Sequence, residues 1–474
     1  MKLKNLLLFS IFVVSGSLFV HAQKTATLRG TAPEYRGYQI DFYSFADGIS
    51  EKKQLLTSFR IAPDGSFSAS VPLDETTYAF TEFDAYHASL FLVPGQEYEL
   101  VFPPLKPVSP SQKRNPFFET DEISFVLKNS DAQELNRQIA QFELAYLKQE
   151  NRYFNQIYHQ HSKVAVDSLK SHLQEQFPKS DDSYFEHYKL YRAAFADFAL
   201  HQGQATEFVQ HYFIEQEPDL SIPPCKQLFQ QLFTNYFEFE ASKIHSADFK
   251  RLVAQAKLEE IENFLMTKNN WSSSLTRLVI LQSIHDAYFQ GQFSPGSMLR
   301  LLDKIAESQW KSENKGIARR LKEKLTYLQQ GSEAPAIVMT DFSGEKHQLR
   351  DFTGKYVYLN FTRVSNPICR QHLDQLKESA SQLGHELHIA NLILPDEAEK
   401  KELIARQNWP GTFYVVDEKA ADTYRVSNFP LAYLIGKKGQ LALSPAPNPL
   451  DGFEQHFLNL LKQNRIFELR NQSK

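Results

Sequence analysis

The sequence of 474 residues predicts a multidomain chain with an N-terminal all-β sandwich, a central irregular α-helical domain and a C-terminal α/β domain. Apolar and polar side chains alternate with period two across residues 24–105, as they do in half-buried strands. Across residues 115–330 apolar side chains recur every three or four positions, which is the spacing of one helix face. Strand-like and helix-like segments then alternate across residues 331–474, which is typical of α/β folds.

The first 22 residues have the pattern of a cleavable signal peptide. Lys2 and Lys4 precede an apolar run over 6–14, and Ala22 ends a small-residue cleavage site. No cysteine follows the apolar run, so a lipoprotein anchor is not indicated. No later stretch approaches the roughly 20 continuous apolar residues of a membrane helix. We therefore expect a periplasmic or otherwise exported mature chain without a transmembrane segment.

Composition excludes two classes of protein. The chain has 52 basic and 56 acidic residues, and no basic stripe interleaved with exposed aromatic residues is evident, so we expect no nucleic-acid binding. Its two cysteines, Cys225 and Cys369, are too few for a disulfide scaffold in a chain of this length. Cys225 lies at a predicted helix start, and we expect it to be a buried structural thiol.

Two turn signals organise the predicted sandwich over residues 24–105. Asp64 and Gly65 lie in the middle of the strand-like stretch 59–71, and this pattern predicts a hairpin. A Pro-Gly pair at 94–95 joins two further strand-like stretches. Short strands and turns at this spacing favour a small sandwich. The stretch contains no evident catalytic set, so we expect it to act in docking or spacing.

The central segment over 115–330 reads as an irregular helical bundle that follows a proline-rich linker. One predicted helix carries aromatic residues at steps of four, three, four and three, namely Tyr184, Tyr188, Tyr191, Phe195 and Phe198. Such a stripe is typical of a helix-packing face rather than a cofactor site. His159 and His161 are two residues apart, which points them to different helix faces, so we expect no metal site there.

The most informative stretch is a strand-like run at 356–361, followed by a turn and a predicted helix at 367–383 with Cys369 in its first turn. Residues 361–370 read Phe-Thr-Arg-Val-Ser-Asn-Pro-Ile-Cys-Arg. This segment resembles the Phe-Trp-Ala-x-Trp-Cys-x-x-Cys-Arg signature of TlpA/ResA-like thioredoxins. The matching positions are Phe361, Pro367, Cys369 and Arg370.

Flanking motifs extend the resemblance over residues 331–474 and imply a thioredoxin-like fold. Residues 331–335, Gly-Ser-Glu-Ala-Pro, are similar to the entry of such domains, and 424–439 are similar to the family's Tyr-x-Val-x-x-x-Pro run. The resemblance implies that Pro430 follows a cis peptide bond and faces the active-site helix. Residues 24–105 also look like the N-terminal β-domain that exported members of the family often carry.

The chain departs from the family signature at the reactive cysteine. Asn366 stands where the signature has its first cysteine, and Thr362 and Ser365 replace the two tryptophans. In a Cys-x-x-Cys motif the first thiol attacks a disulfide and the second resolves the intermediate. Asparagine cannot attack a disulfide, but it is a good helix N-cap. Only the resolving position, Cys369, is kept, so the dithiol cycle is not expected.

We therefore expect a redox-inactive binding or assembly module of the cell envelope without a cofactor. The resemblance implies a binding groove formed by Asn366, Pro367, Phe429 and Pro430, which relatives use to hold extended polypeptide. The expected partner is such a polypeptide or another envelope protein.

A second hypothesis is a thiol-dependent oxidoreductase or peroxidase-like enzyme that uses Cys369 as its catalytic residue. Peroxiredoxins place their cysteine in a Pro-x-x-x-Thr-x-x-Cys motif. In that alignment Asn366 takes the threonine position and Thr362 the proline position, so two of the three motif positions differ. Thiolate activation needs a nearby donor, for which Arg363 is the candidate.

Overall fold

The structure is a computed structural model that describes residues 24–109, 112, 118–129, 131, 133–200, 205–383 and 386–472. The expected signal peptide at residues 1–22 lies outside the described residues. The chain divides into two compact units, one within residues 1–106 and 121–232 and the other within 107–120 and 233–474.

The first unit begins with two β-sheets that share one core. The strands are β1 Lys24–Thr31, β2 Gln39–Phe45, β3 Lys53–Arg60, β4 Ser66–Leu73, β5 Thr77–Phe83, β6 Tyr86–Leu92, β7 Glu97–Val101, β8 Asp121–Ser124 and β9 Val126–Leu127. One sheet has the order β4-β1-β7-β9 and the other β3-β2-β5-β6-β8. Buried side chains of both sheets form a single hydrophobic cluster, including Leu28, Phe42 and Tyr98. The predicted sandwich is thus confirmed.

The turn at Asp64 and Gly65 does not make the paired hairpin that the sequence suggested. It connects β3 to β4, which belong to different sheets. The rings of Phe59 and Phe67 both point into the shared core and stack with centroids 5.0 Å apart. Because both strands bury their apolar side against the same core, the chain arches from one sheet to the other. The Pro-Gly turn at 94–95 likewise links β6 to β7 of the opposite sheet.

Residues 121–127, which fall within the segment predicted to be helical, add short strands to both sheets. β8 pairs with β6 and β9 pairs with β7, while Phe125 between them is buried in the sandwich core. The helices of this unit are α2 Leu135–Phe154, α3 Lys163–Gln176, α4 Ser183–Phe198, α5 Ala205–Val209 and α6 Pro223–Phe233.

The aromatic stripe of α4 is a packing face, as predicted. Tyr188 and Tyr191 are buried, and the Tyr188 ring lies edge-on to Phe91 of β6 with centroids 5.9 Å apart. Cys225, in the first turn of α6, is a free thiol without solvent exposure, and burial raises its pKa. The expectation of a buried structural thiol is therefore met.

The second unit contains further helices and a mixed sheet. The helices that precede the sheet are α7 Tyr236–Ser242, α8 Ala247–Ala254, α9 Leu258–Asn269, α10 Ser273–Gln290, α11 Pro295–Glu307 and α12 Ser312–Thr326. The strands are β10 Val338–Asp341, β11 Lys346–Gln348, β12 Tyr356–Phe361, β13 Leu387–Ile393, β14 Thr412–Val415, β15 Leu431–Ile435 and β16 Leu441–Ala446. The interspersed and final helices are α13 Pro367–Leu383, α14 Lys401–Gln407, α15 Glu418–Thr423 and α16 Phe453–Gln472.

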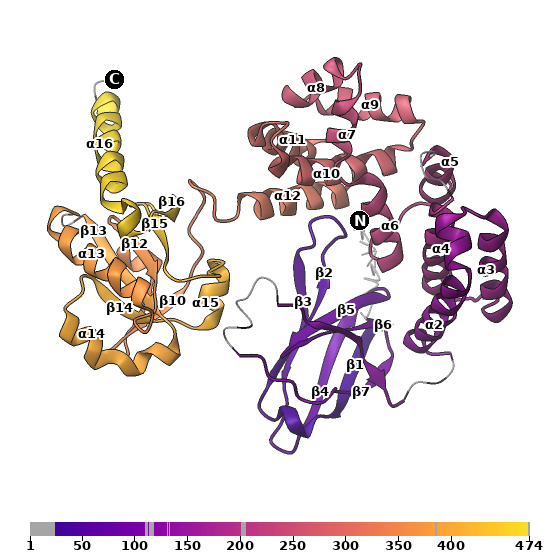
Figure 1. Cartoon of the computed structure of the whole chain (residues 1–474), viewed down its shortest axis with the longest axis horizontal. Coiled ribbons are helices and arrows are strands. Elements are labelled where there is room, and N and C mark those ends of the chain that lie inside the picture. The colour runs from indigo at the N-terminus through magenta and orange to yellow at the C-terminus, as the bar shows by residue number, and fades with distance from the viewer. Residues whose placement is uncertain are drawn as a thin grey trace, which may run out of the picture. The chain divides into compact units, whose positions relative to one another are not determined.

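Strand β12 lies inside this sheet, whose order is β11-β10-β14-β13-β12-β15-β16. It runs parallel to β13 and antiparallel to β15. All six of its residues are buried, because separate hydrophobic clusters cover the two faces of the sheet. Helix α13 follows β12 after a short loop and packs on one face beside α16 (Figure 1). This α/β domain has the predicted thioredoxin-like architecture.

Candidate functional site at the start of helix α13

The candidate site lies where β12 ends and α13 begins. Phe361 is the last residue of β12, and its register partner on β15 is Leu431. Pro430 immediately precedes Leu431, and the Phe429–Pro430 peptide bond is cis, as the resemblance implied. The loop over 362–366 follows the end of β12, and the Phe429–Pro430 pair precedes the start of β15. Because these neighbouring strands are antiparallel, both segments lie at the same end of the sheet.

Asn366 caps helix α13. Its side-chain oxygen accepts the backbone N–H of Ile368 at 2.9 Å, and its carbonyl accepts the N–H of Arg370 at 3.1 Å. Pro367 occupies the first helical position, where its missing N–H would have no intrahelical acceptor. The capping role that the sequence predicted for Asn366 is confirmed.

Cys369 points into the domain and has no solvent exposure. Burial raises the pKa of its thiol, while the backbone N–H of Arg363 and the hydroxyl group of Thr362 lower it to a smaller extent. The neutral thiol is thus the favoured form at neutral pH, and it is not a thiolate poised for attack.

A buried carboxylate fixes the loop before α13, and the sequence reading did not find it. Glu397 is 1% exposed and lies in the turn after β13. It accepts the backbone N–H of Ser365 at 2.9 Å and also the Ser365 hydroxyl. Lys400 lies 3.1 Å from the same carboxylate. Burial alone would raise the pKa of Glu397, but these hydrogen bonds outweigh it and the net pKa is lowered.

Arg363 belongs to this carboxylate cluster. Its guanidinium pairs with Asp396 and lies 3.7 Å from Glu397. The same group is 5.7 Å from the centre of the Phe429 ring, so it connects the loop before α13 with the residue before the cis-proline. Its guanidinium is thus engaged by carboxylates, and both its backbone N–H and, to a smaller extent, its positive charge lower the pKa of the Cys369 thiol.

Apolar side chains are exposed beside the Asn366 cap. Ile368 is 55% exposed, Pro367 is also exposed, and Phe429 and Pro430 are half-buried. Ile368 was not among the predicted groove residues. Its position two residues after the cap, on the outer side of the first helical turn, is the signal that could have found it.

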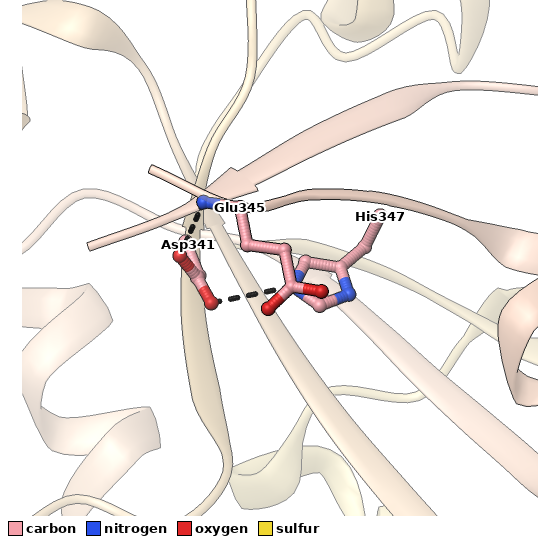
Figure 2. A group of neighbouring side chains, drawn as sticks. All are labelled: Asp341, Glu345 and His347. Atoms are coloured by element: carbon pink, nitrogen blue, oxygen red, sulfur yellow. Dashed lines mark hydrogen bonds and ion pairs between the residues drawn. The ribbon is translucent and has the colours of Figure 1, made fainter. Parts of the chain in front are cut away.

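One group of side chains in the described part of the chain has the composition and spacing of metal ligands. Asp341, Glu345 and His347 surround the β10–β11 turn, with their ligand atoms within 4.8 Å of one another (Figure 2). Asp341 accepts bonds from Ser343 and from the Glu345 backbone, and its second oxygen lies 3.2 Å from His347. The Ser343 hydroxyl is the largest of the influences that lower the pKa of Asp341. The hydrogen bonds explain the local arrangement without an ion.

A cavity of about 640 Å³ belongs to the first unit, between loops of the sandwich and helix α6. Its walls include Phe45, Tyr78 and Lys226. Lys226 is paired with Glu51 at 2.6 Å and lies 4.5 Å from the Phe45 ring centre. The volume is within the range of small-molecule sites, but the lining residues form no catalytic set.

The C-terminal part of the chain is similar to known protein families. Residues 330–444 match the model of the AhpC/TSA family. Thiol-disulfide oxidoreductase ResA of Bacillus thuringiensis (strain Al Hakam) is 30% identical over 123 residues, which are 24% of this chain and 68% of the relative. The chain belongs to the ResA family of thiol-disulfide oxidoreductases. The family match lies in the C-terminal part of the chain.

The chain is also similar to other thioredoxin-like proteins. The thioredoxin-like protein YneN of Bacillus subtilis (strain 168) is 28% identical over 116 residues, which are 24% of this chain and 68% of the relative. A putative thiol-disulfide oxidoreductase from Bacteroides vulgatus is 20% identical, with 26% of this chain and 90% of that chain covered and a TM-score of 0.25. A thioredoxin-like protein from Bacteroides caccae is 18% identical over 49% of this chain and 92% of its own, with a TM-score of 0.27.

This ResA-family chain differs from a dithiol protein in one elementary respect. Its full sequence contains only Cys225 and Cys369, so it has no Cys-x-x-Cys pair. Both thiols are free and buried, each within its own unit. Within the described residues, no helix is both long and apolar enough to cross a membrane.

Proposed function

We propose that the α/β domain is a redox-inactive ResA-like module that holds an extended segment of a partner protein. The observation that supports this most is the pair Asn366 and Cys369. The first is occupied as a helix cap and has no thiol, and the second is fully buried with a raised pKa. Neither side chain offers the exposed thiolate that disulfide exchange requires.

The proposed binding groove consists of Asn366, Pro367, Phe429 and Pro430, to which we add Ile368. An extended peptide would place apolar side chains against Ile368 and Phe429, where contact removes apolar surface from water. The buried Glu397 holds the loop before α13 in place, so part of the groove is formed before the partner arrives. Such a groove requires no thiol.

Peptide binding is tested with an unfolded probe of known sequence, such as reduced and carboxymethylated lactalbumin, by fluorescence anisotropy. Ile368→Ala should weaken binding by about tenfold, which corresponds to about 1.4 kcal/mol. Val338→Ala is the matched control, because Val338 on β10 is 51% exposed and Ile368 is 55% exposed. Equal affinity of both variants and the wild type, or no binding at all, contradicts the proposed groove.

Redox inactivity is tested by insulin reduction in the presence of dithiothreitol. The wild-type chain should not accelerate turbidity above the uncatalysed rate. An insulin-reduction rate within tenfold of that of a Cys-x-x-Cys thioredoxin assayed in parallel contradicts the redox part of the proposal. Such a result does not bear on peptide binding, which the anisotropy measurement tests separately.

The second candidate function is peroxidase-like or other thiol chemistry at Cys369, favoured by the match of residues 330–444 to the AhpC/TSA family. It would require the loop between Phe361 and Pro367 to open and expose Cys369. Arg363 would then have to leave its carboxylate partners to act as the activating donor. Peroxide consumption that is lost in Cys369→Ser would establish this function.

We propose that residues 1–22 are a signal peptide and that the mature chain is exported to the periplasm. We also propose functional domains at 24–105, 115–330 and 331–474, with the β-sandwich acting in docking or spacing. N-terminal sequencing of the protein from the periplasmic fraction should begin at Gln23, and an intact Met1 in the cytoplasmic fraction contradicts export.

A further inference from the structure

Helix α2 exposes three large apolar side chains on the side that faces away from its own core. Leu144, Leu147 and Phe154 are 69%, 44% and 48% exposed. The buried residues of the helix lie on the opposite side, namely Leu135, Ile139, Phe142, Ala145 and Tyr146. A helix that packs on the domain with one face needs no second apolar face, so the outer stripe calls for an explanation of its own.

The outer stripe has heptad spacing. Its positions are separated by steps of four, three, four and three residues, and all are exposed: Ala140, Leu144, Leu147, Asn151 and Phe154. This is the sequence d-a-d-a-d of a coiled coil, in which a and d positions form the seam between two helices. The buried face of α2 packs against α3 and α4 instead, so the heptad seam is available in addition to the internal contacts.

The side chains beside the stripe differ in charge. Glu143 and Glu150 occupy the g positions on one side, and Lys148 occupies an e position on the other. In a parallel pair of such helices, a g residue faces the e residue five positions later on the second helix, so Glu143 would face Lys148 of the second copy. An antiparallel pair would instead bring g residues together, placing glutamates beside each other.

Internal contacts keep Glu143 oriented for this role. Its carboxylate accepts Arg192 Nε at 2.9 Å and the Tyr188 hydroxyl at 2.9 Å, and its side chain remains 26% exposed. A carboxylate has room for further donors beyond these. The ordered carboxylate therefore loses little side-chain entropy when a lysine of another molecule approaches.

We propose that two copies of this chain associate through α2 as a parallel homodimer. Leu144, Leu147 and Phe154 would form the seam. Asn151 would meet Asn151 of the second copy at an a position, where a polar pair sets register and dimer state at a cost in stability. The seam covers about two heptads, so association should be weak, in the micromolar range. The dimer uses neither Cys369 nor the groove, so it is independent of the proposed function.

The oligomeric state of the mature full chain is measured by sedimentation equilibrium from about 1 to about 200 μM, spanning the micromolar Kd expected for the seam. The wild type should show concentration-dependent dimers. Leu144→Glu should be monomeric throughout, with Kd raised at least tenfold. Leu55→Glu is the matched control, because Leu55 on β3 is another exposed leucine of the same unit, at 55% against 69% for Leu144. Circular dichroism melting shows whether each variant is folded.

Orientation is tested by Asn151→Cys under mild oxidation, since a parallel, in-register seam brings the two Cys side chains within disulfide reach. The natural cysteines are buried and give a low background. Ile244→Cys, at a site that is 95% exposed, is the control for random collision. A wild-type chain that stays monomeric, a dimer that survives Leu144→Glu, or cross-linking of Asn151→Cys no faster than the control overturns the proposal.

Discussion

The side chain of Asn366 accepts the backbone N–H of Ile368 at 2.9 Å, so the residue that the resemblance aligns with the first cysteine of the family signature acts as the N-cap of helix α13. The Asn366 side chain thus stabilises the start of helix α13. An N-cap of this kind contributes about 1 kcal/mol to stability. Asparagine at this position supports the helix start but supplies no thiol, so simple replacements of Asn366 test the site.

We predict that Cys369 reacts slowly in the native protein. Its raised pKa leaves little thiolate at neutral pH, and its burial keeps reagents from reaching the sulfur. Alkylation by iodoacetamide at pH 6 should therefore be at least a hundredfold slower than for a free cysteine. In denaturant without reductant, Ellman titration should count both thiols. Fewer than two in a monomer would mean that Cys225 and Cys369 are paired.

Asn366→Cys should create a 366–369 dithiol and give insulin reductase activity that the wild type lacks. The surrounding scaffold, with Pro367 at the helix start and β12 leading into it, is that of the ResA-like fold. Asn366→Ser is the control, since it retains a capping oxygen without a redox pair. If the new cysteine forms no disulfide with Cys369 in a glutathione buffer, the geometry at this position does not support exchange.

Asn366→Ala should lower the free energy of unfolding by about 1 kcal/mol, because the N–H of Ile368 loses its side-chain acceptor. Urea unfolding measures this difference. Asn366→Ser should recover most of it, whereas an unchanged midpoint for Asn366→Ala would show that the cap bond is not stabilising.

Glu397→Gln should destabilise the domain by about 2–3 kcal/mol at pH 7, since it weakens a buried carboxylate's bonds to Ser365 and Lys400. The folded pKa of Glu397 is lowered, so its contribution is present above the ordinary pKa of about 4.5 and is lost as the pH falls through the folded value. The difference between wild type and variant should therefore shrink below pH 4.5. Glu399→Gln, at an exposed neighbour, should show neither effect.

Gly411→Ala should be more destabilising than Gly354→Ala. Both glycines have positive φ, +87° and +92°, which costs an alanine about 1 kcal/mol. A Cβ on Gly411 would also lie 2.4 Å from the carbonyl oxygen of Ile389 on β13, whereas a Cβ on Gly354 meets nothing within 4 Å. The melting temperatures of the two variants should differ by several degrees. Equal melting temperatures would show that β13 moves away from the added Cβ at little energetic cost.

Features that depend on nearby residues were predictable from the sequence. The apolar run of β12, the turn before α13, the cap at Asn366 and the aromatic packing face of α4 each follow from side-chain type and spacing within one helix or strand. The resemblance added the cis bond before Pro430, which no local pattern would have indicated.

Features that depend on distant residues were not predictable. Asp64 and Gly65 correctly indicate a reversal of the chain, but not that β3 and β4 enter different sheets. Glu397 looked like an ordinary helix residue, yet its partner Ser365 lies 32 positions earlier. Strand period and turn type constrain only neighbouring residues, whereas sheet membership and buried ion pairs depend on which surfaces meet when the whole core closes.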